Sequence, residues 1–162
     1  MNNLTKYKYI ILQSFLIFGF VSIIMMLYEF FSGHVIFVAS LGGSAFNLFI
    51  FPHAKGSHSR FVIGGYICGS VAGAAFKFLY NFVSGLEFAG TDYVLVLICA
   101  AAAAVATFLM VTFKMLHAPA VAMAMGLVKD PDCIRTAAAA IIGVTILCLC
   151  RHYLAKYLRD LT

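Results

Sequence analysis

Two uncharged runs of membrane-spanning length dominate this sequence. Tyr9–Tyr28 and Tyr93–Phe113 contain no Asp, Glu, Lys or Arg over 20 and 21 residues. A helix needs about 20 consecutive, mainly apolar residues to cross a hydrocarbon core about 30 Å thick. Surface helices of soluble domains instead carry a polar face. Runs of this kind therefore favour helices that cross a bilayer.

Composition supports the same interpretation along the whole chain. Of 162 residues, 64% are apolar and 10% charged, whereas soluble domains carry roughly 25% charged residues. This excludes a soluble globular enzyme, and the 15% aromatic content excludes a disordered chain. We predict an all-α polytopic membrane protein in which residues 1–162 form a single transmembrane domain.

Charged residues divide the chain into about six transmembrane or part-spanning segments. The second segment contains the small-residue cluster Ser40–Ala45, which weakens a continuous helix. The fifth has only 14 residues, about 21 Å as a helix. We therefore expect both of these segments to be broken. The six segments are residues 9–28, 30–54, 61–83, 93–113, 115–128 and 136–150.

The distribution of Lys and Arg predicts the orientation. If all six segments cross, eight basic residues lie on the N-terminal side, only Lys129 and Arg135 lie opposite, and Lys77 lies near that opposite interface. Because short cytoplasmic loops carry an excess of Lys and Arg, we expect both termini to be cytoplasmic, in the inner membrane of a bacterium. The eight residues are Lys6, Lys8, Lys55, Arg60, Lys114, Arg151, Lys156 and Arg159.

A weak internal repeat relates the two halves. A shift of 75 residues aligns Arg60 with Arg135 and Gly42–Ala45 with His117–Ala120. Three crossings per unit would make the halves inverted repeats, an arrangement that transporters use to bring broken helices together near the midplane. We predict repeats at residues 9–83 and 92–158, with the breaks in the second and fifth segments facing each other.

His117-Ala118-Pro119-Ala120 is the first candidate site element. Pro119 favours extended backbone before it and a helix start at or near it. His117 would then lie just before a helix N-terminus, where free amides and the helix dipole favour an anion. A structural hydrogen-bonding histidine is the alternative, although ionisable groups at membrane depth are commonly functional.

Ser40-Leu41-Gly42-Gly43-Ser44-Ala45 is the matching element. Its glycines leave backbone amides uncovered, and Ser40 or Ser44 could cap a following helix. A kink or a close helix crossing is the alternative. The predicted substrate-binding residues are Ser40, Gly42, Gly43, Ser44, Asn47, His117 and Pro119.

Gly65, Gly69 and Gly73 recur every four residues on one helix face. Small residues in this register let another membrane helix approach closely, so we predict a packing seam; a moving seam is the alternative. The chain contains no motif for a metalloprotease, serine hydrolase or nucleotide-binding site. We expect no enzyme activity, no catalytic residue, no cofactor and no metal site.

In the order and spacing of these elements the sequence resembles the HPP family of small membrane proteins, named for a His-Pro-Pro motif. The resemblance covers roughly residues 34–150 and depends on Ala39–Ala45, Pro52-His53, Arg60-x-x-x-Gly64-Gly65 and Leu116–Ala120. Ala118 stands where the family motif has its first proline. The resemblance implies an integral membrane protein, linked in photosynthetic organisms to nitrite transport.

The leading hypothesis is a transporter or facilitator of a small solute, with a small anion such as nitrite as the favoured substrate. Gly42, Gly43, Ser44 and His117 would bind it. The alternative is a non-transporting membrane module that binds a protein or lipid partner. We expect a homo-oligomer in contact with the lipid bilayer and no nucleic-acid partner, because the basic residues are spread singly between apolar runs.

Overall fold

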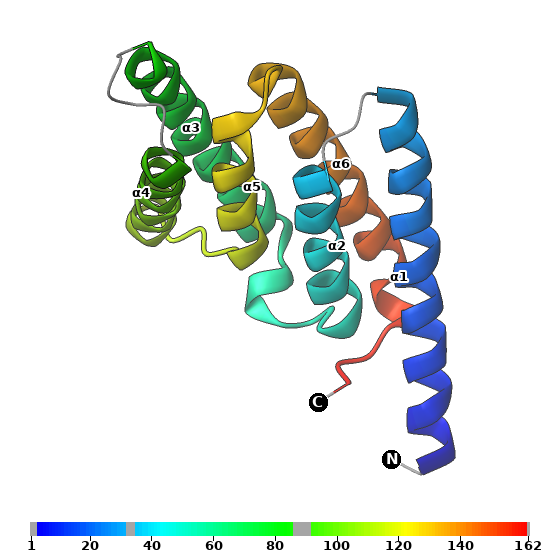
Figure 1. The fold of residues 1–162 in the computed structure, drawn as a ribbon. Coiled ribbons are helices and arrows are strands. Elements are labelled where there is room, and N and C mark those ends of the chain that lie inside the picture. The colour runs from blue at the N-terminus through cyan, green and yellow to red at the C-terminus, as the bar shows by residue number, and fades with distance from the viewer. Residues whose placement is uncertain (1–2, 32–34, 86–91, 162) are drawn as a thin grey trace.

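A computed structural model describes residues 3–31, 35–85 and 92–161, and this part of the chain is helical without strands (Figure 1). The all-α prediction is confirmed. Four helices are long and apolar enough to cross a membrane: α1, α3, α4 and α6. The elements are α1 (Asn3–Phe31), α2 (Val35–Ile50), the 3₁₀ turn Lys55–Ser57, α3 (Ser59–Ser84), α4 (Asp92–Thr112), α5 (Ala118–Lys129), α6 (Cys133–Leu154) and the 3₁₀ turn Ala155–Tyr157.

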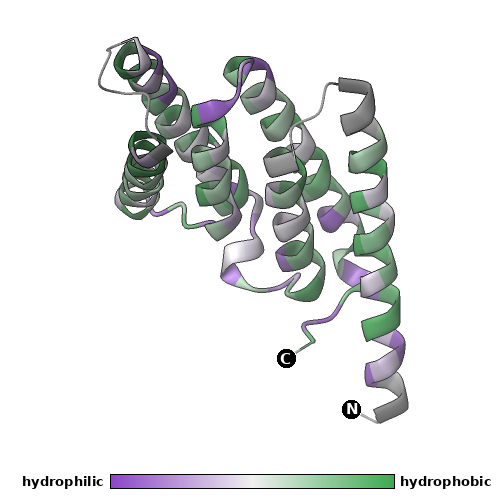
Figure 2. Cartoon of the chain, viewed as in Figure 1, coloured by the Kyte–Doolittle hydropathy of each residue, from purple (hydrophilic) through white to green (hydrophobic). Residues whose placement is uncertain are grey.

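The helices form an up-and-down bundle with α1 at one edge and α4 at the other (Figure 1). Both ends of the chain lie at the same end of the bundle, as does the loop between α2 and α3. The hydrophilic segments gather mainly at helix ends and connecting loops (Figure 2). Many large apolar side chains, such as Phe18 and Phe108, are exposed on the outer faces, as expected where lipid covers the surface.

α2 and α5 are short, as the sequence suggests, but only α5 follows a break. α5 has 12 residues and begins immediately after His117, whose backbone is extended; its length is about 18 Å. α2 runs without interruption over 16 residues, so the predicted break at Ser40–Ala45 is wrong. Its glycines serve close contacts instead: an added Cβ on Gly43 would lie 3.4 Å from the Pro119 ring.

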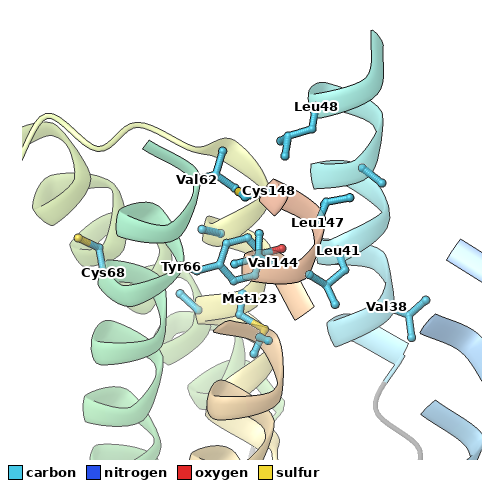
Figure 3. Packing of buried hydrophobic residues seen from close by; sticks show 14 of the residues in the cluster. Val38, Leu41, Leu48, Val62, Tyr66, Cys68, Met123, Val144, Leu147 and Cys148 are labelled. Atoms are coloured by element: carbon cyan, nitrogen blue, oxygen red, sulfur yellow. The ribbon is translucent and has the colours of Figure 1, made fainter. Parts of the chain in front are cut away.

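The core is made chiefly by α2, α3, α5 and α6 (Figure 3). Leu41 and Leu48 of α2 are fully buried, as are Val62 and Tyr66 of α3 and Val144 of α6. Because α2 and α5 pack against longer helices, Ser40 and Ser44 of α2 are buried inside the bundle.

The glycine stripe of α3, where the sequence predicts a packing seam, lies directly against α5. An added Cβ on Gly69 would overlap the Ala120 carbonyl oxygen, and one on Gly73 would lie 2.7 Å from the Ala124 oxygen. Since these neighbours are backbone atoms, they have little freedom to move aside. The increasing order of both sets of residues also makes α3 and α5 run parallel.

The C-terminal tail packs against the end of the bundle where both termini and the α2–α3 loop lie (Figure 1). Leu158 is buried, the Leu161 amide donates to the Ile50 carbonyl at 3.2 Å, and the Gln13 side chain donates to the Arg159 carbonyl at 2.7 Å. Buried Arg151, at the end of α6, donates to the Pro52 carbonyl. The tail therefore ties α1, α2 and α6 together beside the α2–α3 loop.

Candidate functional site

The loop that carries His117 begins at a well-defined helix end. Lys114 has a φ of 56°, its amide donates to the Val111 carbonyl, and the Met115 amide donates to the Met110 carbonyl. This pair of bonds is the Schellman motif, in which the left-handed position is usually glycine. The motif ends α4 and redirects the chain toward α3.

The loop then lies on the paired glycines of α3. An added Cβ on Gly64 would overlap the Met115 side chain, and one on Gly65 would lie 2.6 Å from the His117 Cβ. Two consecutive glycines thus provide the space into which the loop settles. His117 is held there with only 5% of its surface exposed, and it occupies the residue before α5.

Two serines of α2 face this histidine. Ser44 Oγ lies 2.8 Å from His117 Nε2 and also donates to the Ser40 carbonyl at 3.1 Å. Ser40 Oγ donates to the Pro119 carbonyl at 2.8 Å. Both serines are buried. These contacts join α2 to the first turn of α5 in antiparallel orientation.

Tyr66 of α3 completes the group. Its hydroxyl lies 2.7 Å from Ser40 Oγ and 2.9 Å from Ser44 Oγ, and its ring centroid lies 5.8 Å from that of His117. The ring is buried in the apolar core, where Figure 3 shows it beside Val144. We call Ser40, Ser44, Tyr66 and His117 the polar cluster.

Tyr66 is absent from the residues predicted from sequence. A signal was available: it is the one tyrosine inside the glycine-rich stretch 64–73, and a buried tyrosine hydroxyl usually finds a hydrogen-bond partner. Its partners, however, lie 26 and 22 residues away, so the sequence alone does not indicate which side chains it meets.

The structure brings together five of the seven predicted binding residues: Ser40, Gly43, Ser44, His117 and Pro119. Gly42 faces α1 instead, since an added Cβ there would meet Val21 at 3.8 Å. Asn47 lies nearer the α2–α3 loop, and its carbonyl accepts bonds from Phe51 and Ser57.

The expectation of two facing helix N-termini needs correction as well. Only α5 begins at the cluster, because Ser40 and Ser44 lie inside continuous α2, which starts at Val35. The serine side chains therefore supply polar groups that a broken helix would have supplied through its backbone.

The arrangement offers hydrogen bonds without a built-in charge. Three hydroxyls each provide one donor and acceptor lone pairs, and a neutral imidazole provides one donor and one acceptor. The start of α5 adds few amides to this set, because Pro119 has no amide hydrogen and the Ala120 amide donates to the His117 carbonyl at 3.1 Å. Among the described residues no group of three His, Cys, Asp or Glu could hold a metal ion.

Comparison with known proteins identifies the family. A family model described as the HPP transmembrane region matches residues 2–160, nearly the whole chain. A search among curated proteins gives no match, and neither does a search among solved structures. The match also supports an integral membrane protein, in agreement with the four apolar helices. The chain belongs to the HPP transmembrane family.

Proposed function

We propose that this protein is a transporter or facilitator of a small solute, and that the solute is a small anion such as nitrite. The observation that carries the proposal is the polar cluster itself. Four polar side chains from α2, α3 and the start of α5 meet at one buried point of the bundle. Polar groups at such depth are costly, and in membrane proteins they commonly mark a solute path.

The chemistry of the cluster favours a small oxyanion over a cation. Hydroxyl and imidazole N–H groups donate to anion oxygens, and the start of α5 adds the positive end of its dipole. The contact between His53 and Asp160 lies elsewhere, in the loop and tail. A solute held by a few neutral hydrogen bonds is released easily, as transport requires.

The short helices support movement through this region. α2 extends about 24 Å for its 16 residues, less than the roughly 30 Å of a hydrocarbon core. A solute would therefore cross a shorter length of protein between the cluster and either end of α2 or α5 than it would along a longer helix. We propose a homo-oligomer as the working unit, since one copy has little bulk to enclose a path, and we expect no enzyme activity.

We further propose that the protein resides in a bacterial inner membrane with both termini cytoplasmic. The terminal lysines and arginines, together with Lys55 and Arg60 of the α2–α3 region, belong to the end of the bundle where both termini lie (Figure 1). An excess of basic residues at one end is typical of the cytoplasmic side.

Flux through liposomes tests the transport proposal. Purified protein is reconstituted, and nitrite entry is compared among empty vesicles, wild type, His117→Ala, Ser44→Ala and the control His58→Ala. His58 is an exposed histidine of the loop before α3. We expect nitrite entry above empty vesicles for wild type and for His58→Ala, and at least a tenfold loss for His117→Ala. Equal flux from wild type and empty vesicles would overturn the proposal.

The alternative function, a non-transporting module that binds a protein or lipid partner, has one observation in its favour. The hydroxyls of the cluster already have protein partners, as a purely structural network would. This function predicts that wild type moves no nitrite and is recovered from membranes in a stable complex with another protein or lipid. The liposome assay therefore separates the two functions.

A further inference from the structure

The polar cluster contains no positively charged side chain that could compensate the charge of a bound anion. The groups around His117 are uncharged: Ser40 and Ser44 from α2, Gly65 and Tyr66 from α3, and Ala120 of α5, with Cys148 of α6 beside Tyr66. Met115 of the preceding loop is also neutral, and Lys114 is exposed. Buried Arg151 of α6 lies near Cys148, but it donates to the Pro52 carbonyl, and in the described part of the chain no Lys or Arg donates to the cluster.

An uncompensated anion buried among these groups would be expensive, because burying a charge without a partner costs far more than burying a dipole. Asp130 and Arg135 belong to the opposite end of α5 and to the first turns of α6. The 12 residues of α5 place that end about 18 Å from His117. Compensation must therefore arrive with the solute or form on a residue of the cluster.

Counting the hydroxyl hydrogens shows where a positive charge fits. Ser40 gives its hydrogen to the Pro119 carbonyl, and Ser44 gives its hydrogen to the Ser40 carbonyl. With the hydroxyl hydrogens assigned in this way, the imidazole donates to Ser44 Oγ across the 2.8 Å contact from a tautomer that carries its hydrogen on Nε2. Nδ1 is left as the basic nitrogen.

Protonation of Nδ1 leaves this pattern intact. The imidazolium still donates from Nε2 to Ser44, and the Tyr66 hydroxyl still donates to a serine oxygen. The added N–H on Nδ1 becomes a new donor for an oxyanion, and the new charge compensates the anion. His117 is the one side chain of the cluster that can gain a proton to become a cation.

We propose that the anion crosses together with one proton, held on His117 while the anion is bound; this rests on the proposed transport function. The proton comes from the side of entry, occupies Nδ1 and leaves with the anion on the other side. No bond within the solute is made or broken. One negative and one positive charge move together, so each transport cycle carries no net charge.

The test uses the full-length protein in liposomes, with nitrite as the probe. Initial rates are measured under an inward proton gradient, and separately under a potassium diffusion potential set with valinomycin. Empty vesicles are subtracted because protonated nitrite crosses lipid unaided. For wild type we expect the proton gradient to raise the initial rate several-fold and the potential to leave it unchanged. His58→Gln should behave like wild type.

His117→Gln supplies the second arm, since glutamine keeps a donor and an acceptor but does not become a cation. We expect it to lose the response to the proton gradient. Wild-type flux that follows the membrane potential and ignores the proton gradient would overturn the inference while transport stands. Full retention of the gradient response in His117→Gln would overturn the role of His117. Absence of any wild-type flux would overturn the transport proposal and this inference with it.

Discussion

The long helices α1 and α3 are both apolar enough to cross a membrane, yet they occupy different environments. In the most apolar stretch of α3, 50% of the residues are buried inside the protein, whereas 11% are buried in that of α1. Gly19 of α1 has no other atom within 4 Å of an added Cβ, whereas Gly69 of α3 would meet the backbone of α5. One helix lies at the edge of the bundle and the other at its centre.

The difference shows that apolarity and position carry separate information. Apolarity indicates that a segment can cross the bilayer, but both the outer helix α1 and the central helix α3 meet that requirement. The four-residue spacing of glycine marks the central helix, because it permits backbone-to-backbone contact. On α3 the same glycines also make room for the loop that presents His117.

The largest expected effect contrasts these two glycines. Gly69→Ala should lower the free energy of unfolding by about 1–3 kcal/mol, because the new methyl group overlaps the Ala120 carbonyl. Gly19→Ala should leave stability unchanged or raise it by up to about 1 kcal/mol, through helix propensity. Unfolding in mixed micelles measures both variants. Equal effects at the two positions would break the comparison.

A smaller effect is expected where α3 contributes a polar group. Tyr66→Phe removes the hydroxyl that bonds Ser40 and Ser44, and should cost about 0.5–1.5 kcal/mol of unfolding free energy. The matched control on α1 is Tyr7→Phe, whose side chain is 65% exposed and should change little. The same unfolding assay applies. Loss at Tyr7 and none at Tyr66 would show that the cluster contributes nothing to stability.

The smallest effect concerns the turn that delivers His117 to α3. Lys114 holds a left-handed backbone with φ of 56°, which costs a side-chain-bearing residue roughly 1–2 kcal/mol. Lys114→Gly relieves this strain but gives the unfolded chain more freedom, so we expect a net gain of up to about 1 kcal/mol. Lys114→Ala is the control and should give no gain. A loss of stability in Lys114→Gly would mean that the lysine side chain itself supports the turn.

The sequence predicts the helices well where charges bound them. The uncharged run 93–113 corresponds to α4 at Asp92–Thr112, and the predicted third segment, 61–83, to α3 at Ser59–Ser84. The break before α5 is also correct, because Pro119 restricts the preceding backbone locally. The inverted repeat and the orientation in the membrane stay predictions.

The errors arise where one residue type serves two purposes. Glycine at positions 42 and 43 is compatible with a broken helix or with a close helix contact, and only the neighbouring helices decide. Three of the four residues of the polar cluster, Ser40, Ser44 and His117, are among the binding residues predicted from sequence, although the break predicted at the serines is absent. Tyr66 depends on the register between α2 and α3, which no local pattern encodes.

The most direct test of the central claim asks whether nitrite reaches the polar cluster. Protein with ¹⁵N-labelled histidine in lipid nanodiscs is titrated with nitrite, and the imidazole signals are assigned with His117→Ala and His58→Ala. The account predicts a saturable shift of the His117 signals and no shift at exposed His58. The account would be contradicted by a His117 signal that stays fixed in nanodiscs when the same purified protein transports nitrite in liposomes.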